Sequence, residues 1–481
     1  MEGVFSLGSA NPKIANRRGC GGDPWGRGHM GAFFLERWRR RQRRALARPA
    51  GSDESSAHTG VALSVSSVIG ALAGLLSWVI ATRLVDPAEI GKASQFVSAL
   101  LLVAGATQLN LDVGLMRWLP GAGHAAGRLV WRTMLLVMPL AAVVGLVYAV
   151  TLPDIGRTAA GSAPPWVGVV LFVLAAAGWS VFTLHDSVLV ALHRPWWTVW
   201  RNAAFALSRI GLLVVLCVLG FGAQGIVLSW VGSIVFWIAV GSLVLAVLVR
   251  RAAARSAEGS LPTRQEAVRF LGPTAVAQLG TVLLYDQIPV LVVARYGDAT
   301  GGRFFLVWQA LVVVDVAATF FMNALTLGVA QEPAQSARLA AAARRRLLVV
   351  FLPLLALGAL VAAPALDLVF GAAYAEAADV LRLLLAGMAF RLVVLHELGV
   401  RQALGQAMGY ARLQLTSTVL VTVVVIVVPV GDRTVADLLP VAIGYVVVQA
   451  LCMLTVLTLP ALRRLTATTP RRDDDLTQSP R

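Results

Sequence analysis

Charged side chains are scarce in this sequence. Asp, Glu, Lys and Arg make up only 14% of its 481 residues, whereas about a quarter of the residues in a soluble domain are charged. Too few charged groups are therefore present to cover the surface of an ordinary soluble enzyme of this length, and that class of protein is excluded.

Cysteines and catalytic motifs are sparse as well. The three cysteines, Cys20, Cys217 and Cys452, lie far apart, so neither a disulfide framework nor a metal-ligand spacing is present. The sequence has no Gly-Lys-Ser/Thr phosphate loop, which argues against direct use of ATP. We therefore predict no catalytic residues, no bound metal and no organic cofactor.

Apolar residues, in contrast, are abundant: 58% of the chain is hydrophobic and the mean hydropathy is +0.75. A helix needs about 20 apolar residues to cross a bilayer, so the chain has room for about a dozen crossings with short connections. The predicted fold class is an all-α polytopic membrane protein. The twelve predicted spans are 60–82, 94–116, 133–152, 166–190, 203–222, 226–249, 269–294, 304–328, 347–370, 380–400, 413–430 and 436–462.

A repeated joint indicates two halves of six helices each. Arg83 and Asp86 follow the first span in an Arg-x-x-Asp pattern, and Arg295 and Asp298 follow the seventh span in the same pattern. Two bundles of equal polarity place a cavity between them, and rocking of one against the other gives alternating access. The predicted parts are a disordered basic tail at 1–57, bundles at 58–249 and 269–462, a basic linker at 250–268, and a tail at 463–481.

The distribution of positive charge predicts the orientation. One set of alternate connections holds 16 Lys and Arg residues and the other holds 6, and both tails fall on the heavier side. Both termini are therefore expected in the cytoplasm, with the chain in the cell membrane. The arginine-rich tail before the first span is expected to stay uncleaved and solvated and to anchor the orientation of that span. It is not expected to bind nucleic acid. Either Met1 or Met30 is the first residue of the protein.

Ionisable residues inside spans cost about 2.5–3.5 kcal/mol each on insertion scales, so each needs a partner or a use. Gln278 and Tyr285 lie on one face of the seventh span, Asp286 is adjacent, and Pro289 is expected to kink the helix there. Asp315 begins a polar stripe in the eighth span. The carboxylates either face a transport cavity or belong to an internal network.

Two arginines lie deep in the predicted spans. Arg209 follows Asn202 by seven residues on one face of the fifth span, and Arg391 lies in the tenth. Each is expected either in the transport cavity or in an internal network. Glu397 and Arg401, four residues apart, are expected to form a structural ion pair.

Four segments resemble polysaccharide flippases of the O-antigen type, which belong to the multidrug/oligosaccharidyl-lipid/polysaccharide (MOP) exporter superfamily. The resemblance covers about residues 60–460, and the four segments occur in the order typical of that family. They read IATRLVDPAEIGKASQF at 80–96, DVGLMRWLP at 112–120, YDQIPVLVVARYGDATGGR at 285–303, and LVFGAAYAEAADVLRLLL at 368–385 followed by Ala-Leu-Gly at 403–405.

The resemblance implies a two-lobed, MATE-like flippase that moves polyprenyl-pyrophosphate-linked oligosaccharide to the outer leaflet for surface polysaccharide synthesis. Arg209 and Arg391 would bind the pyrophosphate in a cationic cavity. Asp286 and Asp315 would carry a coupling proton or sodium ion, or would hold those arginines in place. The implied partners are membrane lipids, the lipid-linked oligosaccharide, and glycosyltransferases or a polymerase of the same pathway.

Two other functions stay open at this point. One is a cation-coupled exporter of small organic molecules from the same superfamily, although such exporters typically have an acidic residue in the first span and this first span has none. The other is a membrane scaffold that transports nothing. Lipid II flippases resemble a fourteen-span design with basic residues in the first span, and both features are absent here.

Overall fold

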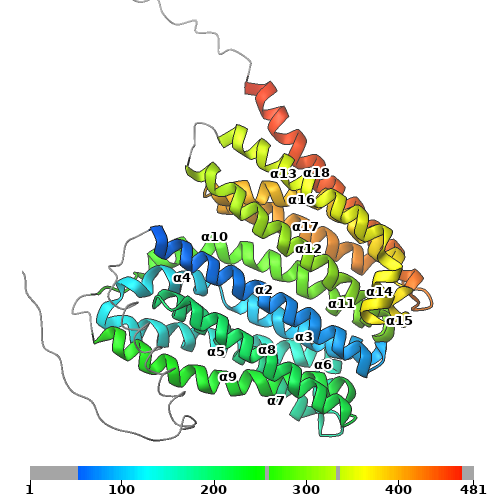
Figure 1. Ribbon diagram of the computed structural model, residues 1–481, viewed down its shortest axis with the longest axis horizontal. Coiled ribbons are helices and arrows are strands. Elements are labelled where there is room, and N and C mark those ends of the chain that lie inside the picture. The colour runs from blue at the N-terminus through cyan, green and yellow to red at the C-terminus, as the bar shows by residue number, and fades with distance from the viewer. Residues whose placement is uncertain (1–52, 255–258, 332–335, 468–481) are drawn as a thin grey trace, which may run out of the picture. The chain divides into compact units, whose positions relative to one another are not determined.

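A computed structural model describes residues 53–254, 259–331 and 336–467, and its regular elements are all helices. The predicted all-α fold class is confirmed (Figure 1). Contacts divide the chain into two units, Met1–His58 and Thr59–Arg481, and every contact described below lies within the second. Most of the two predicted tails lies outside the described residues.

Proline sets the start of four helices in the first half, and one of them also has a polar cap. The Asp86 carboxylate accepts a hydrogen bond from the Glu89 backbone N–H at 3.0 Å and so caps the helix that follows. Proline occupies the first turn of four helices, where its missing N–H costs no hydrogen bond. The helices are α2 (Asp53–Leu84), α3 (Pro87–Thr107), α4 (Leu111–Trp118), α5 (Ala126–Thr151), α6 (Pro153–Ala160), α7 (Pro165–Ala191), α8 (Pro195–Val218) and α9 (Gly222–Ala253).

The second half begins at a capping box, in which Thr263 and Glu266 each bond the backbone N–H of the other. Its long first helix is interrupted by one π-helical turn, η3 (Leu283–Gln287), which ends just before Pro289. The predicted distortion near Asp286 therefore takes the form of this turn. The other elements are α10 (Arg264–Val282), α11 (Ile288–Tyr296), α12 (Asp298–Gln331), α13 (Ser336–Leu360), α14 (Ala362–Phe370), α15 (Ala372–Ala375), α16 (Ala378–Ala403), α17 (Ala407–Val427) and α18 (Leu439–Ala467).

The described helices form a multi-pass membrane protein. Ten of them are long and apolar enough to span a bilayer, and α13 and α14 form one further pair bent by 74°. The tenth of the twelve predicted spans corresponds to α16, which has 26 residues but is not among these candidates. Its five charged residues lower its hydropathy, and α12, α13 and α18 pack around it.

The second predicted span, 94–116, is wrong at both ends. The spanning helix α3 ends at Thr107, because Leu109 and Asn110 adopt left-handed backbone angles (φ 51° and 59°) that break the helix. Asp112 therefore lies in the separate short helix α4, outside the membrane-spanning segment. Burial raises the pKa of the Asp112 carboxyl there.

The linker between the halves is shorter than predicted. Helix α9 continues to Ala253 and α10 begins at Arg264, so both extend into the predicted 250–268 segment. We call the end of the helices at which α9 ends and α10 begins the linker end, and the opposite end, where α3 and α12 begin, the far end. The division into two separate bundles stays a prediction.

The halves meet along α3, which packs against α10, α11 and α12 (Figure 1). At the far end the approach is so close that a Cβ on Gly91 would lie 1.9 Å from the Asp298 carbonyl oxygen, and one on Gly302 would lie 2.2 Å from that of Pro87. Arg83 crosses from α2 to donate to the Leu368 carbonyl of α14 at 2.6 Å. The far end is thus closed by direct backbone packing between the halves.

Candidate functional site

In the second half, Asp315, Arg391 and Tyr285 form one buried polar cluster. Arg391 Nε lies 2.5 Å from Asp315 Oδ1, and both residues are only 2% exposed. Tyr285 donates its phenolic hydrogen to the second carboxylate oxygen of Asp315 and accepts a hydrogen bond from Arg391 Nη2 at 3.1 Å. The charge of Arg391 is therefore neutralised within α12, α16 and the π-helical turn, which favours an internal network over an open cationic cavity.

Asp286 follows Tyr285 in the π-helical turn but belongs to no such cluster. It is half-buried, and it makes no ion pair or hydrogen bond with any residue in the described ranges. The next residue, Gln287, accepts a hydrogen bond from the Tyr148 hydroxyl of α5 at 2.8 Å, so the turn touches the first half. A carboxyl group without a protein cation, placed where the halves meet, is chemically able to take up a proton or a metal cation.

In the first half, Arg209 is buried without a carboxylate. Its side chain is 5% exposed, and Nη2 donates to Ser77 Oγ at 2.7 Å and to the Ala73 carbonyl at 3.4 Å. The guanidinium lies 4.2 Å from the ring centre of Trp230, a cation–π contact that offsets part of the desolvation. Within the described part of the chain no acidic side chain pairs with it, and Nε has no hydrogen-bond partner.

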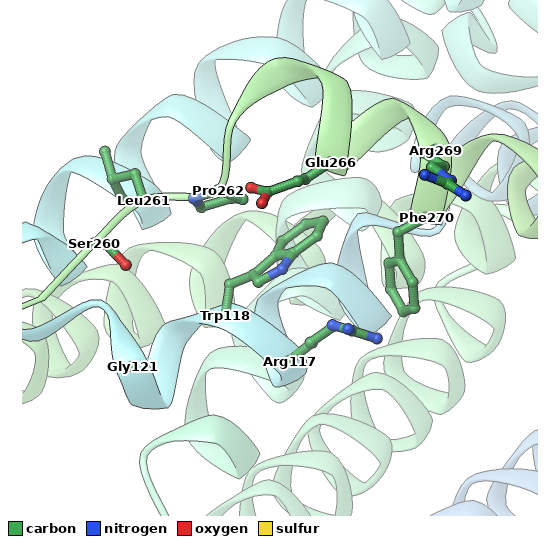
Figure 2. A pocket seen from close by; sticks show the side chains of 9 residues that line it. All are labelled: Arg117, Trp118, Gly121, Ser260, Leu261, Pro262, Glu266, Arg269 and Phe270. Carbon is green, nitrogen blue, oxygen red and sulfur yellow. The ribbon is translucent and has the colours of Figure 1, made fainter.

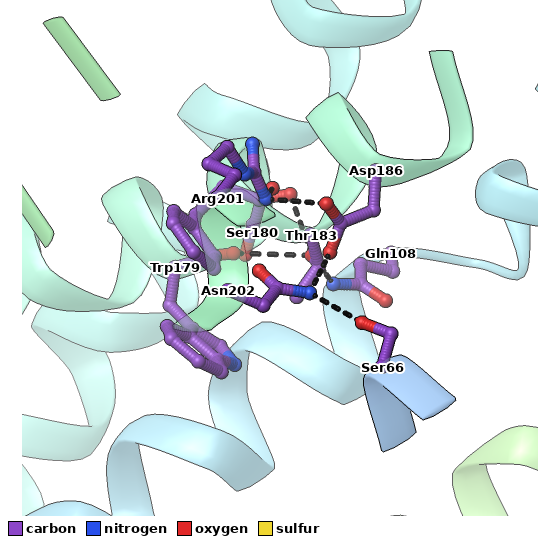
Figure 3. Close-up of polar contacts among 9 residues, drawn as sticks. Ser66, Gln108, Trp179, Ser180, Thr183, Asp186, Arg201 and Asn202 are labelled. Carbon is purple, nitrogen blue, oxygen red and sulfur yellow. Dashed lines mark hydrogen bonds and ion pairs between the residues drawn. The ribbon is translucent and has the colours of Figure 1, made fainter. Parts of the chain in front are cut away.

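A second cluster in the first half centres on Arg201 and Asp186 (Figure 3). Arg201 Nη2 lies 2.7 Å from the Asp186 carboxylate and donates to the Phe182 carbonyl, also at 2.7 Å. Asn202 Nδ2 donates to Asp186 Oδ2 and to Ser66 Oγ, each at 3.0 Å. The cluster joins α2, α7 and α8 and leaves Arg201 8% exposed.

Sequence reasoning missed Arg201, since it treated that arginine as part of a connection. Helix α8 begins at Pro195, six residues before Arg201 and eight residues before the predicted start of the span at 203. The signal was available, because a proline is favourable at the first turn of a helix. Counting the helix from Pro195 places Arg201 inside it.

The other residues named from the sequence lie outside these clusters. Gln278 of α10 is half-buried and makes no hydrogen bond within the described residues. Glu397 and Arg401 form the predicted ion pair at 2.8 Å.

Arg209 and Arg391 lie on α8 and α16, in different halves, and no contact joins them. In residues 53–254, 259–331 and 336–467, no group of three His, Cys, Asp or Glu side chains is placed to hold a metal ion.

Comparison with known proteins identifies the fold but not a close relative. No protein-family model matches the chain, and no curated protein matches it. Solved structures do match: an inward-facing multidrug resistance MATE family transporter of the MOP superfamily has a TM-score of 0.59 at 16% identity, over 86% of this chain and 100% of that one. A MATE transporter in complex with MaL6 has a TM-score of 0.55 at 14% identity, over 86% and 97%.

A third match is a MOP superfamily transporter from Pyrococcus furiosus, with a TM-score of 0.55 at 15% identity over 86% of this chain and 96% of that one. It is described as having a binding pocket of reverse polarity that suggests a different function. The chain therefore has the fold of MOP superfamily transporters, the class to which these solved structures belong.

Proposed function

We propose that this protein is a flippase that moves a polyprenyl-pyrophosphate-linked oligosaccharide across the cell membrane by alternating access, for surface polysaccharide synthesis. The observation that carries the proposal is Arg209, a buried guanidinium that no carboxylate neutralises within the described residues. A buried charge without a counterion is costly, and a substrate anion would supply that counterion during transport.

The chemistry of the guanidinium suits a pyrophosphate. Arginine stays charged when buried and presents planar N–H donors that match phosphate oxygens. Arg209 uses Nη2 for Ser77 and Ala73 and has an unpartnered Nε, so donor capacity remains for a ligand. The Pyrococcus furiosus transporter is an example of a MOP superfamily pocket with unusual polarity, which supports assigning substrate class from the site and not from the fold alone.

The direction of transport depends on the orientation of the protein and on which end is closed. We propose that the linker end faces the cytoplasm, with both termini there, because the more basic connections lie at that end. With the far end closed by the contacts of Gly91 and Gly302, substrate would enter from the cytoplasmic leaflet. Glycosyltransferases or a polymerase of the same pathway are the proposed partners.

Complementation tests the proposal. In a strain that lacks this protein, wild type should restore surface glycan and Arg209→Gln should lower it at least about tenfold, the loss of one charge-assisted contact. Arg209→Lys should restore part of it. Arg128→Gln, an exposed arginine of α5, is the matched control and should behave as wild type. Full restoration by Arg209→Gln would contradict the proposal and would fit a scaffold that transports nothing.

A second function, a cation-coupled exporter of small organic molecules, is favoured by one observation. Asp286 has no cationic partner in the described residues, and its turn touches both halves. The exporter proposal predicts that wild type protects cells against toxic organic cations, that Asp286→Asn abolishes this protection, and that surface glycan is normal in both. The flippase proposal predicts no protection, and a loss of glycan with Asp286→Asn if that carboxyl carries the coupling ion.

A further inference from the structure

A cavity of about 600 Å³ opens at the linker end, apart from the clusters described above. Its walls are Arg117 and Trp118 of α4, Arg269 and Phe270 of α10, and the extended segment at 260–262 before α10 (Figure 2). None of these residues contacts Arg209, Arg391 or Asp286. The cavity therefore needs an explanation of its own.

Two cations, Arg117 and Arg269, line the cavity. The Arg117 guanidinium lies 4.3 Å from the ring centre of Phe270, and Trp118 packs edge-on against the same ring at 5.6 Å. Arg117 and Arg269 make no ion pair with any side chain in the described ranges. Both side chains are exposed.

The acidic residue in the wall does not compensate them. Glu266 Oε2 accepts a hydrogen bond from the Thr263 backbone N–H at 2.8 Å as part of the capping box that starts α10. Figure 2 shows its carboxylate turned toward Pro262 and away from Arg269. The helix start thus holds this carboxylate in place, and the two guanidinium groups stay available.

The walls come from opposite halves of the protein. Helix α4 follows α3 in the first half, and α10 opens the second half. Gly114 of α4 also faces Leu271 of α10, since a Cβ on Gly114 would lie 3.3 Å from the Leu271 side chain. A ligand in the cavity would bridge the halves at the end opposite to Gly91 and Asp298.

We propose that this cavity binds a phosphate-bearing anion, held by Arg117 and Arg269 with Trp118 and Phe270 beneath it. Two arginines form charge-assisted, forked hydrogen bonds with phosphate oxygens. The rings of Trp118 and Phe270 provide a surface on which an apolar part of the ligand packs. The ligand is either the headgroup of an anionic phospholipid or a soluble phosphate compound. Because binding joins α4 to α10, it stabilises the arrangement in which the linker-end segments of the two halves are close.

The full-length protein in nanodiscs tests both sources of phosphate. In the first arm, nanodiscs contain phosphatidylcholine with phosphatidylglycerol, and native mass spectrometry counts the phosphatidylglycerol molecules that stay bound. In the second arm, nanodiscs contain phosphatidylcholine alone, and thermal unfolding is followed while inorganic pyrophosphate is added. Binding in the first arm identifies a lipid, and a thermal shift in the second identifies a soluble ligand.

The decisive variant is Arg117→Gln/Arg269→Gln, which should bind at least about tenfold more weakly in the positive arm. The control, Arg128→Gln/Arg132→Gln, removes the same number of charges from exposed positions on neighbouring α5 and should bind as wild type. Arg117→Lys/Arg269→Lys should retain part of the affinity. No binding in either arm, or equal losses in both Gln pairs, would overturn the proposal, the latter because it indicates a generally basic surface.

Discussion

Buried arginines in this protein differ in what compensates their charge. Arg391 is paired with Asp315, and Arg201 with Asp186. Arg209 has a hydroxyl, a carbonyl and an indole ring around it, but no acid within the described residues. Removing one partner of a buried ion pair leaves an uncompensated charge, whereas removing Arg209 leaves none. The three arginines should therefore respond differently to substitution.

The Asp315–Arg391 pair gives a stability prediction. Asp315→Leu leaves the buried Arg391 without its counterion and should lower the free energy of unfolding by about 3–5 kcal/mol. The double variant Asp315→Leu/Arg391→Met removes both charges and should recover most of that loss. Unfolding of the purified proteins, followed by heat or denaturant, measures both effects. If the double variant is as unstable as Asp315→Leu alone, the ion pair is not the source of the loss.

At this scale the sequence indicates which ionisable residues lie in helices, but not their partners. Asp315 and Arg391 are 76 residues apart, and only the packing of α12 against α16 brings them together. Tyr285 and Asp286 are adjacent, yet one joins that cluster and the other does not, because successive side chains on a helix point in different directions. No local pattern indicates which side chain of another helix each of these residues meets.

At the scale of helices, residues that start or interrupt a helix indicate its ends better than the length of an apolar run does. Pro195 and the left-handed Asn110 mark boundaries that apolar runs alone misplaced by several residues. The repeated joints were predictable: Asp86 caps α3, and Asp298 begins α12. The close approach of these two helices could not be predicted, because it depends on which glycines face each other across the halves.

That approach predicts an effect of side-chain size at Gly91. Gly91→Val places a Cβ against the Asp298 carbonyl, so α3 and α12 must separate, at a cost of about 1–3 kcal/mol or more. The free energy of unfolding should fall, and a cysteine introduced at buried Ser94 should react faster with a membrane-impermeant maleimide added from the far end.

Gly70 provides the matched control for this experiment. It lies on α2, and a Cβ added there would have no heavy atom within 4 Å, so Gly70→Val should leave both stability and labelling close to wild type. Equal behaviour of the two valine variants would contradict a far end closed by backbone packing.

At the scale of the whole molecule, composition and hydropathy were sufficient for the fold class, and solved MOP superfamily transporters share the fold. The predicted count of twelve spans exceeds the ten or eleven candidates among the described helices. The remaining helix is α16, which has a spanning length and five charged residues, of which Arg391 is buried and Asp379 and Arg382 are exposed. A few side chains determine which substrate binds, and the fold alone does not identify it. The proposed transport therefore depends on Arg209 acting as a counterion for the transported anion.

The most direct test is transport by purified protein in liposomes. A polyprenyl-pyrophosphate-linked oligosaccharide is incorporated, and its movement between leaflets is followed by its access to an impermeant glycosidase. The account predicts that wild type moves the lipid, that Arg209→Gln does so at least about tenfold more slowly, and that the two unfold at similar temperatures, because no buried acid is left unpaired. Equal transport rates for wild type and Arg209→Gln would contradict it.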